Sequence, residues 1–218
     1  HDGAPQSDQV MNVVPKAGYT LDRRSEWDAM GMRGTGTEAF LVTAKGSTAQ
    51  IMPTPYGEMA AATMTPVSHM LWSACWTGIA GDAVARAWNF LRAKRKPGDT
   101  DLPAGAVNLG EAVEVLQMAE ARLKVALDRF NWETPTAPSF AGAAFDNGLK
   151  TAVSEACLHV AREALVVCGF AGYARSGDFS VSRHVRDLTS APLMIGNTRM
   201  REGSARLLLA QRPQLGLA

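Results

Sequence analysis

The chain has 218 residues, with 22 lysines and arginines against 21 aspartates and glutamates, for a net charge of +1 at neutral pH. A balance this close to zero excludes the overall basic field that would steer a protein toward nucleic acid or an anionic membrane. No apolar run approaches the length of a membrane span, and the first residues lack the apolar segment of a secretion signal. We therefore expect a soluble, cytoplasmic protein with neither nucleic acid nor a membrane as its partner.

Residues 10–52 carry short segments that are typical of strands, separated by glycine, proline and lysine–glycine turns. The expected strands are 10–14, 19–21, 37–43 and 49–52. Four short strands cannot bury both of their faces, so we expect them to join a larger sheet or to pack on helices. We assign residues 1–54 to a partial β domain and residues 55–218 to a helical domain.

Beyond residue 55 the apolar residues recur at spacings of three and four, which predicts helices with one apolar face. The first helix is expected to start at Thr65–Pro66, because proline is tolerated in the first turn, and to end before the polar turn at 94–105. Further helices are expected around 109–130, 149–167 and 198–211. The pattern predicts a mainly α fold, an up-down four-helix bundle preceded by a small β-sheet segment.

The cysteines and tryptophans are expected to serve packing. Cys75, Cys157 and Cys168 fall inside apolar helical patterns and not at metal-ligand spacing, which predicts reduced core thiols and no metal site. Trp72, Trp76 and Trp88 recur at helical spacing and predict core or interface packing.

The stretch 169–197 carries the functional signal, in the strings GFAGY (169–173), RHVRD (183–187) and MIGN (194–197). Gly169 and Gly172 would let a ligand approach the main chain, although a simple helix end also explains them. Arg183 and Arg186 could bind phosphate or pair with Asp178 or Asp187.

These strings resemble the C-terminal signature of the acyl-CoA dehydrogenase family, in which Gly-Gly-x-Gly-Tyr precedes Arg-His-x-Arg-Asp and a Tyr-Glu-Gly-Thr box. The segment 27–40 (WDAMGMRGTGTEAF) is similar to the family's Gly-x-Arg-Gly-Thr-x-Thr strand pair, and the two motifs follow the family's order. The resemblance implies the second half of the middle β domain followed by the C-terminal four-helix bundle. No counterpart of the family's N-terminal half is present, so a partner chain or a longer product is expected to supply it.

The resemblance also implies a flavoprotein of fatty acid metabolism that binds FAD and an acyl-CoA-type substrate. Such a protein removes an α-proton from the thioester with a glutamate while the flavin accepts hydride from the β-carbon. It would assemble as a homo- or hetero-oligomer, a dimer or tetramer, through the helical bundle.

The proton-accepting glutamate has no clear counterpart in this chain. The position that matches it holds Ile195, and the alternative position on the first bundle helix holds Ser68 and His69. Two weak candidates remain, His69 for its near-neutral pKa and Glu202 in the local string REGS. The alternatives are a satisfied, partly buried histidine and a solvated glutamate on a helix face.

By the same resemblance, the residues expected to contact the cofactor are Gly169, Gly172, Tyr173, Asn197 and Arg199. The last two fall where the family contacts the adenine part of FAD, and both side chains can hydrogen-bond a nucleotide.

Three functions stay open: an acyl-CoA dehydrogenase-like enzyme, a non-catalytic flavin-supporting subunit of a hetero-oligomeric dehydrogenase, and a flavin monooxygenase on the same fold. The second follows from the missing glutamate, and the third from the resemblance of such monooxygenases to this family, since they dispense with the glutamate.

Overall fold

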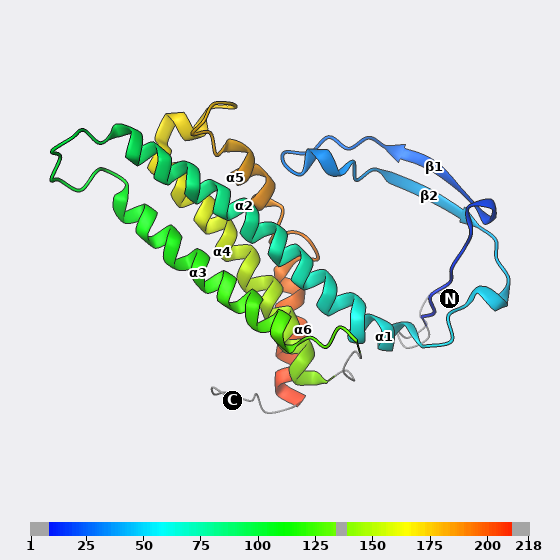
Figure 1. The fold of residues 1–218 in the computed structure, drawn as a ribbon. Coiled ribbons are helices and arrows are strands. Elements are labelled where there is room, and N and C mark those ends of the chain that lie inside the picture. Colours follow the sequence, from blue (N-terminus) through cyan, green and yellow to red (C-terminus); the bar gives the residue numbers. More distant parts are fainter. Residues whose placement is uncertain (1–8, 134–138, 211–218) are drawn as a thin grey trace.

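The computed structural model describes residues 9–133 and 139–210. Long helices lie side by side in a bundle, and a two-stranded hairpin stands beside it, joined through the short helix α1 (Figure 1). The bundle consists of α2 (Thr65–Lys94), α3 (Ala106–Arg129), α4 (Phe140–Tyr173) and α6 (Asn197–Ala210). The mainly α fold with a four-helix bundle after a small β segment is therefore confirmed, whereas the division into domains at residue 54 stays a prediction.

The first long helix begins earlier than its sequence pattern indicates. Helix α1 (Tyr56–Met59) passes through a π-helical turn at Ala60–Met64 directly into α2, with the Thr65 N–H bonded to the Ala60 carbonyl. Pro66 has no N–H to donate back to the preceding turn, and a local widening to π geometry accommodates that missing bond. The expected start at Thr65–Pro66 is the point where regular α geometry begins.

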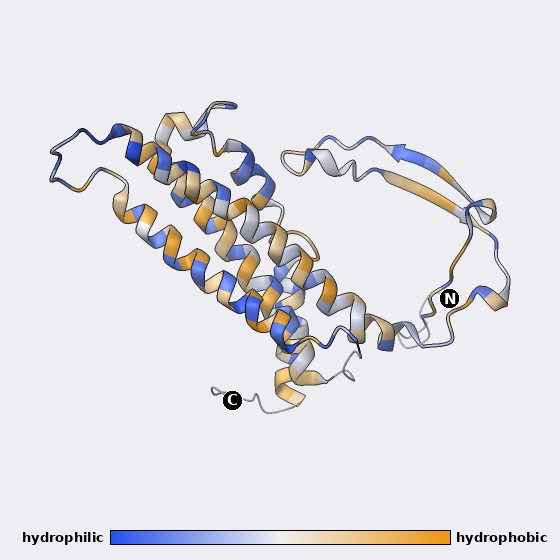
Figure 2. Ribbon diagram, viewed as in Figure 1, coloured by the Kyte–Doolittle hydropathy of each residue, from blue (hydrophilic) through white to orange (hydrophobic). Residues whose placement is uncertain are grey.

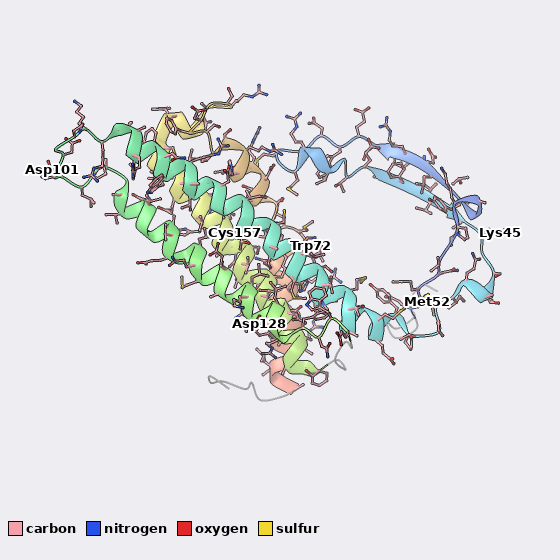
Figure 3. The ribbon with its side chains drawn as sticks, in the orientation of Figure 1. Lys45, Met52, Trp72, Asp101, Asp128 and Cys157 are labelled. Carbon is pink, nitrogen blue, oxygen red and sulfur yellow. The ribbon has the colours of Figure 1, made fainter. Side chains whose placement is uncertain are left out.

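Helix α4 is the centre of the bundle and packs against α2, α3 and α6. Its apolar side includes Leu149, Val153 and Cys157, all fully buried, and Figure 3 shows Cys157 within the bundle. Among the described residues α4 alone is long and apolar enough to cross a membrane by length and composition. The sequence prediction that no run approaches that length is wrong for this helix, whose composition suits the middle of a helical core.

The hairpin consists of β1 (Tyr19–Ser25) and β2 (Ala39–Ala44), paired antiparallel with Leu21 opposite Val42. The other two expected strands are wrong, because residues 10–14 and 49–52 pair as an isolated bridge between Asn12 and Ile51 and not as strands. A short 3₁₀ turn at Thr48–Gln50 replaces the fourth strand. It is fixed by Ser47 and Gln50, whose side chains cap each other's backbone.

Both strands of the hairpin are exposed almost throughout. The hydropathy colouring in Figure 2 marks β2 as the more apolar strand. Because side chains alternate between faces, Leu21, Phe40 and Val42 share one face of this two-stranded sheet. Nothing in the described part of the chain covers that face.

Two packing predictions hold in part. Cys157 and Cys168 are buried free thiols, but Cys75 is exposed on the outer side of α2, so its assignment to the core is wrong. Trp76 is a core residue that stacks on Trp72, with ring centroids 6.3 Å apart. Trp88 lies on the surface under the guanidinium of Arg92.

Candidate functional site

The hairpin touches the bundle where the two family-like motifs meet. The loop between β1 and β2 reaches helix α5 (Ser182–Thr189), and the Met32 N–H donates to Asp187 Oδ1 at 2.6 Å (Figure 1). Gly31 is buried against the main chain of Arg186, and a Cβ at position 31 would collide with the Arg186 carbonyl. We call these four residues, Gly31, Met32, Arg186 and Asp187, the junction. It brings segments 155 residues apart into direct contact.

Helix α5 is held to α2 by a small charged cluster. His184 Nε2 lies 2.6 Å from Asp82 Oδ2, and the Arg86 Nε donates to the same oxygen at 2.7 Å. The hydrogen bond from Arg86 lowers the pKa of Asp82, with His184 acting in the same direction. Arg86 also donates to the Asp178 carbonyl at 3.2 Å, which fixes the loop before α5. The cluster therefore sets the position of α5, and with it the junction.

The two arginines of the RHVRD string take different environments. Arg183 is exposed and its Nε lies 3.4 Å from Asp187 Oδ2, so its carboxylate neighbour is Asp187 and not Asp178. The Nε of Arg186 is buried with no hydrogen-bond partner in the described part of the chain. An unpaired buried donor of this kind calls for an acceptor that these residues do not supply.

The glycines expected near the cofactor have distinct structural roles. Gly169 takes φ 55° and ψ −135° and breaks α4 one turn before its end, and no atom lies near its missing Cβ. Gly172 is packed inside the bundle, where a Cβ would lie 2.6 Å from Cys168 Cβ and 3.2 Å from Val181. Tyr173 is exposed. Gly169 and Tyr173 therefore face outward, whereas packing against Cys168 and Val181 accounts for Gly172.

The connection between α5 and α6 contains the position that matches the family's glutamate. Ile195 occupies it with φ 55°, in the left-handed region, and is half exposed. Asn197 is buried, and its side chain bonds Lys150, Ser154 and Glu155 inside the bundle. Arg199 is exposed on α6. Of the two residues expected at the adenine, only Arg199 presents a side chain to an outside ligand; both contacts stay predictions.

The two candidate bases differ in exposure. His69 is almost fully buried in α2, with its Nδ1 3.0 Å from the Asp146 carbonyl, and burial lowers its pKa. A neutral imidazole with Nδ1 facing a carbonyl donates from that nitrogen, which leaves Nε2 as the acceptor. Glu202 is exposed on α6. Both arrangements suit the alternative of a satisfied core histidine and a solvated glutamate, and a catalytic role for either stays a prediction.

Two buried titratable residues were missed in the sequence. Lys150 is fully buried on α4 and Asp146 is half-buried one turn before it. Desolvation lowers the pKa of Lys150 to about 8 and raises that of Asp146 to about 6. The only signal in the sequence was the position of Lys150 between Leu149 and Val153 on the apolar face of the pattern.

A cavity of about 210 Å³ lies between the start of α2, the end of α3 and the start of α4. Its walls combine apolar side chains, among them Met70, Phe130 and Phe145, with the charged side chains of Arg129 and Asp146. None of the residues expected to contact the cofactor lines it.

Comparison with known proteins rests on structure. No protein-family model matches the sequence, and no curated protein matches it. A probable acyl-CoA dehydrogenase from Mycobacterium abscessus superposes with a TM-score of 0.73 at 18% identity, over 94% of this chain and 54% of that one. The chain therefore has the C-terminal fold of the acyl-CoA dehydrogenases.

Other solved structures with this acyl-CoA dehydrogenase-like fold have different names. Nitroalkane oxidase in complex with spermine, a competitive inhibitor, gives a TM-score of 0.75 at 16% identity, over 96% of this chain and 51% of that one. TdsC from a Paenibacillus species, with FMN and indole, gives 0.69 at 22% identity, over 94% and 56%. The chain spans about half the length of these structures. Such low identities establish the fold and leave the reaction to be argued from the site.

Proposed function

We propose that this chain is the C-terminal half of a flavin-dependent oxidoreductase with the acyl-CoA dehydrogenase fold. The observation that carries the proposal is the junction, where the Gly31–Met32 loop and the Arg186–Asp187 end of RHVRD bind each other directly. Two motifs recognised separately in the sequence are thus parts of one place in the molecule. The named flavoprotein nitroalkane oxidase and the FMN complex of TdsC support a flavin as the cofactor.

Several residues spread over this half of the protein fit a flavin in part. Gly169 leaves open space above the main chain, Tyr173 and Arg199 are exposed, and Arg186 keeps a buried N–H without an acceptor. These groups would hold the cofactor, which when bound would accept hydride from the substrate. The side-chain amide of Asn197 is hydrogen-bonded inside the bundle and is not free to bind the adenine of FAD. The residues of this half therefore support a flavin cofactor but do not favour FAD over FMN.

We favour α,β-dehydrogenation of an acyl-CoA as the reaction, with the proton acceptor supplied by the other half of the protein. That half would come from a partner chain or from a longer product, and assembly would run through the helical bundle in the cytoplasm. If the other half also carried the full active site, this chain would be a flavin-supporting subunit.

A flavin monooxygenase is the second candidate, and Ile195 favours it. An isoleucine side chain cannot accept a proton, so a reaction that needs no carboxylate at this position fits the chain without a replacement base. The structural likeness to TdsC with FMN and indole points in the same direction.

The test is the visible absorption spectrum of the purified chain, alone and with added FAD or FMN, followed by anaerobic addition of a medium-chain acyl-CoA. Intact mass of the same sample identifies any co-purified partner. Bleaching of bound flavin by the acyl-CoA, in a sample that also contains the half with the proton acceptor, is the expected result for a dehydrogenase. A flavin that stays oxidised with acyl-CoA, but consumes oxygen with a small aromatic substrate once it has been reduced, would favour the monooxygenase over the dehydrogenase. Absence of flavin binding, alone or with a partner, would remove both.

A further inference from the structure

Lys150 joins both ends of the connection that carries Ile195. Its Nζ donates to the Ala191 carbonyl at 3.1 Å and to Asn197 Oδ1 at 2.7 Å. Ala191 follows α5 closely, and Asn197 is the first residue of α6. One ammonium group on α4 thus binds the beginning and the end of the same connection.

The connection between these two points adopts a conformation that its sequence disfavours. Ile195 and Gly196 are successive left-handed residues, with φ 55° and 46°. A β-branched residue rarely adopts this region, so the surrounding structure must impose it. Four backbone bonds then close the turns, from the amides of residues 193, 194, 196 and 197 to carbonyls of residues 190, 192 and 193.

The hydrogen bonds of the Asn197 side chain connect Lys150 to an ion pair at the surface. Its amide nitrogen donates to Ser154 Oγ and to Glu155 Oε1, both at 3.0 Å, while Glu155 Oε2 accepts from Arg201 at 2.6 Å. The start of α6 is therefore tied to α4 through the side chains of Asn197 and Arg201.

Burying a lysine at this position costs free energy. Burial disfavours its charged form, and the pKa of Lys150 falls accordingly. The indole of Trp76, with its centroid 5.8 Å from Nζ, offers partial compensation. A methionine would fill a similar volume without a desolvation cost, so packing alone does not explain the residue.

We propose that Lys150 is a positioning residue that fixes the conformation of residues 191–197 for the flavin site, an inference that rests on the proposed function. The ammonium group acts through the backbone at Ala191 and the amide of Asn197, and does not contact the substrate. Its role is to hold the Ile195–Gly196 turn in place beside α5.

The test compares wild type with Lys150→Met, and with Lys124→Met as the matched control, because Lys124 is exposed on α3 and pairs with Asp128. Hydrogen exchange is measured on peptides covering residues 190–197 and on α3. We expect at least about tenfold faster exchange of the four turn amides in Lys150→Met, with α3 unchanged and Lys124→Met like wild type. Unchanged exchange at 190–197 overturns the proposal whether or not flavin binds.

A second readout is the dissociation constant and the visible spectrum of bound flavin. Lys150→Met should weaken flavin binding about tenfold and shift the spectrum of the bound flavin. Asn197→Ala should have the same effect, and the double variant should show no larger effect than either single variant, because the two residues act as one unit. Equal flavin binding by wild type and Lys150→Met would overturn the role at the flavin site. If wild type binds no flavin, the proposed function fails, and exchange decides the positioning role. If Lys150→Met does not fold, Asn197→Ala carries both measurements.

Discussion

Asp146 has a carboxyl group whose charged form is disfavoured by its surroundings. Asp146 lines the cavity at the start of α4, and burial raises the pKa of its carboxyl group from 3.8 to about 6, against the opposing effect of Arg129. The folded protein therefore binds this proton more tightly than the unfolded chain does. At neutral pH the charged carboxylate reduces stability.

Replacing Asp146 by asparagine should stabilise the protein at pH 7. As pH rises from below 3.8 to above 6, wild type should lose about 1–3 kcal/mol of unfolding free energy relative to Asp146→Asn, since one pKa unit corresponds to about 1.4 kcal/mol. Urea denaturation at pH 4 and pH 7 measures the difference. Asp128→Asn is the control, because Asp128 is an exposed partner of Lys124. A difference that does not change with pH would contradict the assignment.

Arg199 should separate the two possible flavins. It is exposed at the start of α6, where the resemblance places a contact with the adenine part of FAD, and FMN lacks that part. We expect Arg199→Ala to weaken FAD binding by about 1 kcal/mol, the typical worth of one hydrogen bond, and to leave FMN binding unchanged. Titration with each flavin measures this, with Arg206→Ala, exposed on the same helix, as the control. Equal losses for both flavins would place Arg199 elsewhere in the site.

At the scale of elements, the junction depends on a glycine. A methyl group at position 31 would overlap the Arg186 carbonyl and lie 2.8 Å from the Asp187 nitrogen, so the loop and α5 would have to separate. Gly31→Ala should therefore speed hydrogen exchange at Met32, whose N–H loses its bond to Asp187, by at least about tenfold, while the bundle keeps its stability. Gly34→Ala, in the same loop with no atom near its missing Cβ, should behave as wild type. Protection of Met32 in both variants would show that the junction tolerates a side chain.

The long helices were predictable because their apolar residues recur over many turns, and the pattern at 65–94 needed no knowledge of the rest of the chain. Helix α5 was missed because its eight residues are mostly polar and charged, and the bonds that hold it come from Asp82 and Arg86, far away in the sequence. The motifs predicted that residues 27–40 and 183–187 matter. They did not predict contact between them, because a backbone N–H bonded to Asp187 leaves no trace in the sequence.

At the scale of the whole molecule, the hairpin is the part with the lowest stability of its own. Two paired strands are marginally stable in water, and the shared face of Leu21, Phe40 and Val42 is exposed. The comparison structures contain about as much chain again as this one spans. We propose that the remaining half packs on this face.

Hydrogen exchange over the full length should show how much less stable the hairpin is than the bundle. The β1 and β2 amides should exchange orders of magnitude faster than those of α4, because opening a hairpin breaks few buried contacts. Adding the complementary half should bring the hairpin to the protection of the bundle. Strong protection in the chain alone would mean that a second copy covers the face, and dilution would then remove the protection.

The junction also bears on how freely this loop can change. Its contact to the loop runs through the main chain at Gly31 and Met32, so position 31 must have no side chain, and position 32 must keep an N–H and the left-handed conformation that Met32 adopts (φ 51°). Residues 33 and 34, which are exposed, can therefore be varied widely while the loop stays attached to α5. A fold attached in this way can alter what it presents to a ligand without first having to rebuild the contact that holds it together.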